Sequence, residues 1–175
     1  MTENRLWRPL GYCDSEASAG SYGEGVYIVD SSGKRYFDGY SGLWNVNLGY
    51  GNEPVKQAMH EQIDRLFFVN PLFFSESHGE ALAERLCKLL PGEMERVFFT
   101  CTGSEAVEAA IKAARKYCEN IGKPFRNIAV FGNSYHGSYY GSMSASEFEG
   151  HYRKGYGPLL PGFLSLGIPC KWEAE

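Results

Sequence analysis

The chain has 175 residues, of which 43% are hydrophobic and 22% are charged, and its formal net charge is −4. An acidic chain with no run of basic residues is not expected to bind nucleic acid, and no apolar stretch reaches the roughly 18 residues of a membrane-spanning helix. The five cysteines are scattered and show no C-x-x-C spacing, which disfavours a disulfide framework and a metal site. We therefore expect a cytoplasmic globular protein without a bound metal, and one that interacts with neither nucleic acid nor membrane.

The first part of the chain is expected to form an irregular arm and a β-hairpin. Residues 11–24 are rich in Gly and Ser, which indicates irregular structure. Residues 26–29 and 35–37 flank the sequence Asp-Ser-Ser-Gly at 30–33, and this pattern predicts two strands joined by a glycine-containing turn. The residues that follow, 41–54, are rich in turn formers and are expected to form a loop.

Two helices are predicted next, separated by an irregular aromatic segment. Pro54 suits a first helical turn, and apolar residues follow it at helical spacing as far as Leu66. The segment FFVNPLFF, residues 67–74, contains Pro71 and is not expected to be regular. Ser77 and Glu80 have the spacing of a capping box, which predicts a helix that ends before Pro91-Gly92.

Residues 97–112, VFFTCTGSEAVEAAIK, predict a buried strand, a tight turn and a helix. Thr102 and Glu105 have capping-box spacing, and unpaired N–H groups at Gly103, Ser104 and Glu105 would form a phosphate site at the positive end of the helix dipole. The turn alone fits two interpretations, an ordinary capped helix or a phosphate site. Apolar residues behind the cap form one helical stripe: Val107, Ala110, Ile111, Ala114, Tyr117 and Cys118.

A second buried strand is predicted at residues 128–131, which completes a βαβ unit with residues 97–99. Tyr135 and His136 follow this strand, so they are expected to lie near the phosphate turn at the same sheet edge. Such a pair suits a flat phosphorylated cofactor, although Tyr135 alone also fits a buried loop aromatic and His136 a hydrogen-bonded loop histidine. The last 25 residues predict no regular element.

Several segments together resemble the N-terminal part of class III (ω-amino acid:pyruvate type) aminotransferases, which use pyridoxal 5′-phosphate. They are DSSGKRYFDGYSGLWNVNLGYG, FFVNPLFF, LPGEMERVFFTCTGSEAVEAAIKAARKY and NSYHGS followed by GPLLPG. The resemblance implies an α/β fold of fold type I, seen here as a hairpin arm and the start of a mainly parallel sheet with flanking helices. It places residues 1–50 in the small domain and residues 51–175 in the first part of the cofactor-binding large domain.

The resemblance also implies roles for individual residues. The cofactor phosphate would be bound by Gly103 and Ser104, next to the capping Thr102. Tyr135 would cover the pyridine ring, with His136 and Gly137 shaping the turn beneath it. The substrate pocket would be lined by Trp44 and by Phe73 or Phe74. The chain departs from the family pattern at Tyr50, where many relatives have histidine, and at Tyr139 and Tyr140, where small residues are common.

The chemistry of the family needs a lysine that holds the cofactor covalently and a carboxylate that pairs with the pyridine nitrogen. No lysine of this chain matches that position; Lys112 and Lys116, with Glu108, have the spacing of a solvated helix face. We therefore expect a chain without a catalytic residue of its own, inactive without the missing C-terminal half. Its expected protein partner is a second copy, in a homodimer, or a complementing C-terminal half. Its substrates would be an amine donor and a keto-acid acceptor.

Two alternatives remain open. The first is a non-catalytic relative that acts as an interaction or regulatory partner. The second is an unrelated α/β hydrolase or nucleotide-binding domain. It is disfavoured because the chain contains no G-x-S-x-G, G-x-G-x-x-G or G-x-x-x-x-G-K-[ST] motif.

Overall fold

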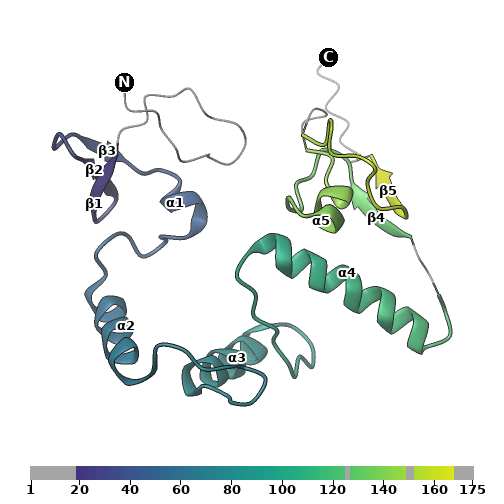
Figure 1. Cartoon of the computed structure of the whole chain (residues 1–175), viewed down its shortest axis with the longest axis horizontal. Coiled ribbons are helices and arrows are strands. Elements are labelled where there is room, and N and C mark those ends of the chain that lie inside the picture. Colours follow the sequence, from purple (N-terminus) through teal and green to yellow (C-terminus); the bar gives the residue numbers. More distant parts are fainter. Residues whose placement is uncertain (1–18, 125–126, 149–151, 168–175) are drawn as a thin grey trace. The chain divides into compact units, whose positions relative to one another are not determined.

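The computed structural model describes residues 19–124, 127–148 and 152–167 (Figure 1). The chain divides into two compact units, Met1–Gly79 and Glu80–Glu175. The first unit holds an antiparallel sheet and two helices, and the second holds a parallel strand pair with its own helices. Helix α3 (Ser77–Leu89) begins in the first unit and ends in the second.

The sheet of the first unit has the strand order β1 (Gly20–Glu24), β2 (Tyr27–Asp30) and β3 (Arg35–Phe37). Strands β2 and β3 confirm the predicted hairpin, in which Ile28 lies opposite Tyr36. The prediction of an irregular arm is wrong for residues 20–24, which pair antiparallel with β2. The sequence of β1 has little β-propensity, so its strand form depends on this pairing. Residues 11–18 of the predicted arm lie outside the described part of the chain.

The hairpin turn is organised by the carboxylate of Asp30. It accepts hydrogen bonds from the backbone N–H and hydroxyl of Ser32, the N–H of Lys34 and the hydroxyl of Tyr36. These bonds, above all that from the Ser32 hydroxyl, lower the pKa of Asp30 to about 2. The neighbouring Val29 is 2% exposed and is the most deeply buried hydrophobic residue of the described sheet.

Helix α2 (Glu53–Leu66) confirms the helix predicted from Pro54. The Asn52 side chain accepts from the Val55 N–H at 3.1 Å, which caps the helix. Residues 67–74 are irregular, as expected. Helix α3 also forms and ends before Pro91, but its predicted cap is wrong. The carboxylate of Glu76 accepts from the Gly79 N–H at 2.9 Å, and Ser77 is the first helical residue.

Residues predicted as a loop contain one short turn, α1 (Ser41–Trp44). Its backbone is left-handed, with φ between 50° and 67° at all four residues. Three of these residues are not glycine, although L-amino acids with a side chain rarely adopt such angles. The sequence therefore carries only Gly42 as a local signal for this turn.

The second unit contains α4 (Gly103–Asn120), β4 (Ile128–Phe131), α5 (Tyr140–Ala145) and β5 (Phe163–Leu166). Strands β4 and β5 are parallel, with Ile128 opposite Phe163. A βαβ unit therefore exists, but it runs β4–α5–β5 and not from residues 97–99 through α4, as predicted.

Two predictions about strands are corrected by this arrangement. Residues 97–99 do not form a strand, because no strand in the described ranges supplies the ladder hydrogen bonds that this segment would need. The last 25 residues, for which no element was predicted, contain β5, which is stabilised by pairing with β4.

Helix α4 packs on α5, and the face of α4 with reduced exposure differs from the predicted apolar stripe. Ile111 is buried, and Val107 and Cys118 are partly so. Ala110, Ala114 and Tyr117 are exposed. Arg115 lies on the less exposed face, where it donates to the Pro161 carbonyl and lies over the Phe163 ring. Polar partners on neighbouring segments allow a partly polar face to be buried, so hydrophobicity alone does not mark it.

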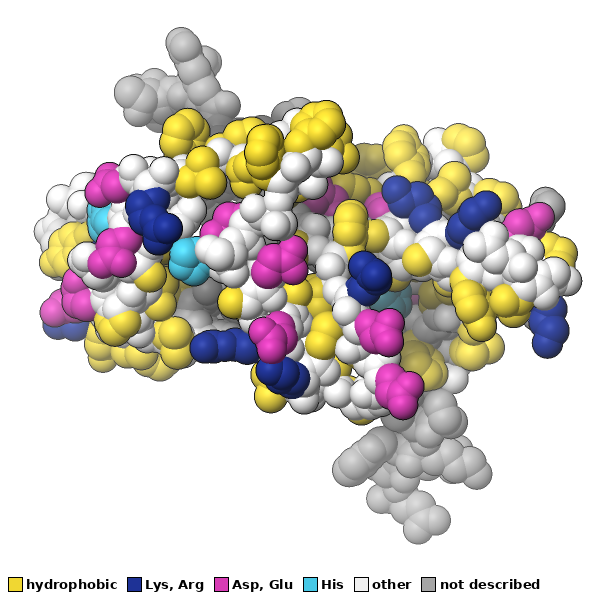
Figure 2. All heavy atoms as spheres, turned by 90° about the horizontal axis from the view of Figure 1, so that it is seen from below, with side chains coloured by type: hydrophobic (Ala, Val, Ile, Leu, Met, Phe, Trp, Pro, Cys, Tyr) yellow, Lys and Arg dark blue, Asp and Glu magenta, His cyan; other side chains and the backbone are white. Residues whose placement is uncertain are grey.

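Many large hydrophobic side chains are exposed, as Figure 2 shows. The most exposed are Phe67, Leu72, Leu89, Phe98 and Phe73, each at least 77% accessible. Exposed hydrophobic surface of this extent usually marks surface that packs against other protein.

Candidate functional site

The first turn of α4 has the geometry of a capped helix with free donors. The Thr102 hydroxyl accepts from the Glu105 N–H at 3.1 Å, which confirms the predicted start of the helix. The Glu105 carboxylate reaches back to the N–H of Cys101, at 2.8 Å. Because Thr102 already binds the Glu105 N–H, only the N–H groups of Gly103 and Ser104 remain as the first-turn donors without an intrahelical partner. This corrects the prediction of three free donors.

The space beside Gly103 is open. A side-chain carbon added there would meet no atom within 4 Å. The two free N–H groups and the positive end of the helix dipole thus border an open position of the kind that binds a phosphate. The residues present fit the phosphate of the implied cofactor.

The loop after β4 lies against this turn, as predicted. The Ser138 N–H donates to the Ser104 hydroxyl at 3.0 Å, and the two hydroxyl oxygens are 3.5 Å apart. Gly137 makes this approach possible. A side-chain carbon on Gly137 would lie 2.7 Å from the Oγ atoms of both Ser104 and Ser142, and its φ of 132° is unfavourable for any other residue.

Helix α5 is joined to α4 by the carboxylate of Glu108. Oε1 of Glu108 accepts from the Ser142 N–H at 2.7 Å. A side-chain carbon at Gly141 would overlap the same carboxylate, so only glycine fits there without a shift. The predicted solvated face is confirmed for Lys112 and Lys116, which are exposed. Glu108 differs, because it binds the first turn of α5.

His136 is held through its backbone, and one atom of its ring has no partner. Its N–H donates to the Ser146 hydroxyl at 2.8 Å, and that hydroxyl donates to the Ser142 carbonyl at 2.8 Å. The Nε2 atom of His136 is buried and has no hydrogen-bond partner within the part of the chain that the structure describes. A fully hydrogen-bonded loop histidine is therefore not what the described residues show.

Tyr135 is 54% exposed and contacts two aromatic rings. Phe148 and Tyr152 contact it edge to face, with ring centroids 6.1 Å and 5.6 Å away. Burial, and after it the contact with the Tyr135 hydroxyl, raises the pKa of Tyr152 to about 12, while a contact with Ser138 acts in the opposite direction. Phe148, Tyr152 and Ser138 were not predicted as site residues, and the aromatic residues after the NSYHGS segment were the signal that could have indicated the first two.

The predicted substrate residues lie in the first unit and are largely exposed. Trp44 is part of the left-handed turn, and Phe73 and Phe74 both donate backbone N–H groups to the Asn70 carbonyl at 3.2 Å. The phosphate turn and Tyr135 belong to the second unit. A pocket shared by the two groups therefore stays a prediction.

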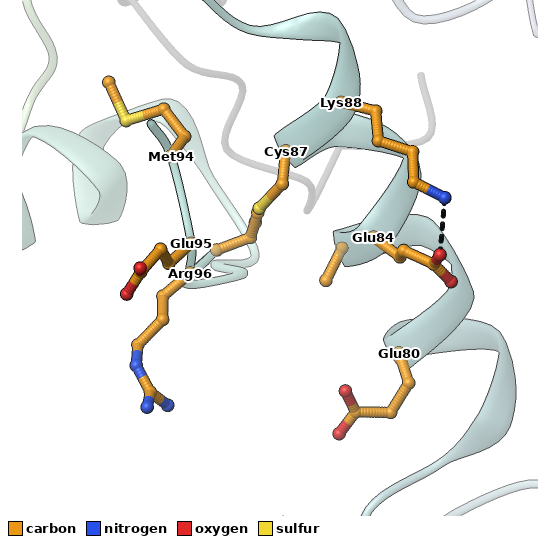
Figure 3. A pocket seen from close by; sticks show the side chains of 9 residues that line it. Glu80, Glu84, Cys87, Lys88, Met94, Glu95 and Arg96 are labelled. Atoms are coloured by element: carbon orange, nitrogen blue, oxygen red, sulfur yellow. Dashed lines mark hydrogen bonds and ion pairs between the residues drawn. The ribbon is translucent and has the colours of Figure 1, made fainter. Parts of the chain in front are cut away.

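Two of the hollows in the described part of the second unit bear on where the site lies. One, of about 570 Å³, adjoins the phosphate turn and is lined by Cys101, Glu105, Glu108 and Tyr139 among others. The other, of about 710 Å³, lies between α3 and residues 94–97 (Figure 3). Charged side chains dominate its lining, Lys88 is paired with Glu84, and it contains none of the predicted site residues. None of the predicted site residues lines the first hollow either, so we place the candidate site at the first turn of α4 and the loop after β4, and not in a hollow.

Within the described ranges, no cluster of three or more His, Cys, Asp or Glu side chains could hold a metal ion. The helices in the same ranges are too short or too polar to cross a membrane. The three cysteines that the structure describes, Cys87, Cys101 and Cys118, carry free thiols.

Comparison with known proteins identifies relatives over almost the whole chain. The family model described as aminotransferase class-III matches residues 17–175. Acetylornithine aminotransferase of Aquifex aeolicus is 42% identical over 81% of this chain and 37% of its own length. Putrescine–pyruvate aminotransferase of Pseudomonas aeruginosa is 37% identical over 87% of this chain and 33% of its own length. The chain thus spans about a third of the length of these relatives.

Solved structures agree. An amine transaminase from an uncultivated Pseudomonas species, in its pyridoxal-phosphate-bound form, superposes with a TM-score of 0.88 at 36% identity. The alignment covers 95% of this chain and 39% of that one. An (S)-enantioselective omega-transaminase from Thermomicrobium roseum gives a TM-score of 0.82 at 40% identity, over 90% of this chain and 35% of that one.

These matches confirm the predicted fold class, because the chain corresponds to the N-terminal third of fold-type-I aminotransferase structures. The predicted domain boundary after residue 50 stays a prediction. The chain belongs to the class III aminotransferase family.

Proposed function

We propose that this chain binds the phosphate end of pyridoxal 5′-phosphate in an enzyme that transfers an amino group from an amine or ω-amino acid to a keto acid. The observation that carries the proposal is the hydrogen bond from the Ser138 N–H to the Ser104 hydroxyl. It holds the loop that carries Tyr135 beside the open first turn of α4. The similarity to a transaminase with bound pyridoxal phosphate supports the same assignment.

Each residue of the site would have a separate task. The N–H groups of Gly103 and Ser104 would donate to the phosphate, and the Ser104 hydroxyl, which accepts from Ser138, still has its own proton to donate. The exposed ring of Tyr135 would stack on the flat heterocycle. The buried Nε2 of His136 is a further polar atom that a ligand at this loop could satisfy.

When bound, pyridoxal phosphate supplies the electron sink that stabilises negative charge at the substrate carbon. The residues of this chain would bind and orient the cofactor. Proton transfer needs a lysine and a carboxylate that no position of this sequence matches. We propose that a complementing C-terminal half provides them, because a homodimer of this sequence alone would lack them in both protomers. Trp44, Phe73 and Phe74 would bind an apolar group of the amine donor.

The binding proposal is tested with pyridoxine 5′-phosphate, which lacks the aldehyde and cannot attach to surface lysines. Calorimetric titration of the purified chain should show saturable binding, and pyridoxine without the phosphate should bind far more weakly. Ser104→Ala should weaken binding by roughly tenfold or more, since it removes a hydrogen bond to a charged group. Tyr135→Leu should weaken it by about three- to tenfold.

Tyr117→Leu is the matched control, because Tyr117 is an exposed tyrosine on α4 and lies outside the proposed site. Its affinity for pyridoxine 5′-phosphate should equal that of the unmodified chain. Equal binding of the two pyridoxine forms would refute the phosphate site. Absence of any binding would favour the alternative of a non-catalytic interaction partner.

A further inference from the structure

The turn that carries Trp44 has an unfavourable backbone. Ser41, Leu43 and Trp44 have φ of 50°, 59° and 67°, with Gly42 at 58° between them. In this conformation the side-chain carbon of an L-amino acid crowds the following carbonyl oxygen. Such backbone persists only where the surrounding structure holds it in place. The groups that hold this turn lie in the residues on either side of it.

The carboxylate of Asp38 binds the turn directly. Its Oδ2 atom accepts from the Gly42 N–H at 2.7 Å, and its Oδ1 atom accepts from the Tyr40 N–H at 3.2 Å. The same Oδ2 accepts from the Tyr50 hydroxyl at 2.7 Å. The hydrogen bond from Tyr50 is the main reason that the pKa of Asp38 lies below its ordinary value, so the carboxylate is charged at neutral pH.

Tyr50 is fixed in turn by the β-sheet. Its backbone exchanges two hydrogen bonds with Gly25, at 2.7 Å and 3.1 Å. Its ring lies over Gly23 of β1, where a side-chain carbon would overlap the ring. A continuous chain of contacts thus runs from β1 through Tyr50 and Asp38 to the second residue of the turn.

The indole of Trp44 has little packing of its own. Trp44 is 73% exposed, so few side-chain contacts hold its indole, and the backbone of the turn sets the direction in which the side chain leaves the chain. The Trp44 N–H donates at 2.9 Å to the carbonyl of Tyr40, the residue directly before the turn. Any group that sets the turn therefore sets the position of Trp44.

We propose that Asp38 and Tyr50 are positioning residues, which hold the Ser41–Trp44 turn in its left-handed form and so fix Trp44 for substrate binding. The relevance to substrate rests on the proposed function, whereas the positioning itself does not. Histidine also has a ring N–H that can donate to Asp38, so a histidine at position 50 could take the place of the tyrosine hydroxyl. The turn then requires a hydrogen bond from residue 50 to the Asp38 carboxylate, and not a tyrosine in particular.

The test uses the full chain with Trp7→Phe and Trp172→Phe, so that Trp44 is its single tryptophan. Two readouts are followed: the hydrogen-exchange rate of the Gly42 amide, by NMR, and the mobility of Trp44, by fluorescence anisotropy decay. Neither needs cofactor or substrate. A failure of the phosphate-binding proposal, which concerns residues of the second unit, would leave both readouts unaffected.

Tyr50→Phe and Asp38→Asn should each raise the Gly42 exchange rate by roughly tenfold and shorten the anisotropy decay of Trp44. Tyr50→His should restore both values. Tyr36→Phe is the matched control, because it breaks the same kind of bond, from a tyrosine hydroxyl to Asp30 at 2.9 Å, in the same sheet.

Unchanged exchange and mobility in Tyr50→Phe would overturn the proposal, as would an equal change in Tyr36→Phe. If Asp38→Asn does not fold, as judged by far-UV circular dichroism, Tyr50→Phe decides the question, because it removes a single oxygen. Failure of Tyr50→His to restore the turn while the chain remains folded would also count against the pairing.

Discussion

Gly137 offers the sharpest test of how the candidate site is built. Replacing it with alanine adds one carbon between two hydroxyl oxygens, each 2.7 Å away, at a φ of 132°. Ser142, on one side, is fully buried and cannot move aside easily. Backbone strain costs about 1–3 kcal/mol and overpacking about 1–3 kcal/mol, so Gly137→Ala should lower the free energy of unfolding by roughly 2–6 kcal/mol.

Two matched glycines in the same unit separate these contributions. Gly155 has a φ of 89°, and a side-chain carbon added there would meet no atom within 4 Å, so Gly155→Ala should show the strain alone, about 1–3 kcal/mol. Gly141 has an ordinary φ, but a side-chain carbon there would meet the Glu108 carboxylate. Gly141→Ala should therefore show the clash alone.

Urea unfolding of the three variants, followed by circular dichroism, measures the differences. Gly137→Ala should be the least stable, and it should also bind pyridoxine 5′-phosphate more weakly, since the loop would move away from Ser104. If Gly137→Ala is no less stable than Gly155→Ala, the close approach of the loop to α4 is not what requires glycine, and the reasoning is refuted.

Two further predictions concern local hydrogen bonds. Thr102→Ala should lower the free energy of unfolding by about 1 kcal/mol, because it removes the cap of α4, whereas Thr102→Ser should retain most of it; equal losses in both would contradict the capping role. The pKa of Asp30 is lower in the folded chain than the 3.8 of an unperturbed carboxyl, so its stabilising effect is present above pH 4 and is lost as the pH falls toward 2. Urea midpoints measured between pH 5 and pH 2 should fall less steeply for Asp30→Asn than for the unmodified chain, and parallel curves would show that Asp30 does not contribute.

Helices α2, α3 and α4 could be predicted from the sequence because their signals are local, whereas α5 was not predicted. A cap such as Thr102 acts on an N–H three residues away, and the structure shows that bond. Strands depend on partners that are distant in sequence. Strand β5 pairs with β4 across 35 positions, and residues 97–99 have a strand-like composition but no partner strand in the described ranges. Composition alone could therefore neither predict β5 nor exclude a strand at residues 97–99.

The candidate site, too, could be predicted only in part from the sequence. The phosphate turn and the loop after β4 do lie close together, as the Ser138–Ser104 bond shows, although the strand at residues 97–99 on which that prediction rested does not form. The residues that support the site could not be predicted from the sequence. Glu108 has the spacing of a surface ion pair, and Tyr152 belongs to no predicted element. Their roles depend on side chains that meet only after folding, at Ser142 and Tyr135 respectively.

The support of Tyr135 by Phe148 and Tyr152 has a consequence for binding strength. A flexible aromatic side chain loses rotamer freedom when a ligand stacks on it, at a cost of about 0.5–1.5 kcal/mol. Here two rings and a hydroxyl already restrict Tyr135 before any ligand arrives. The side chain of Tyr135 therefore loses little further rotamer freedom on binding. A flat ligand that stacks on it should bind more tightly than it would on a flexible tyrosine.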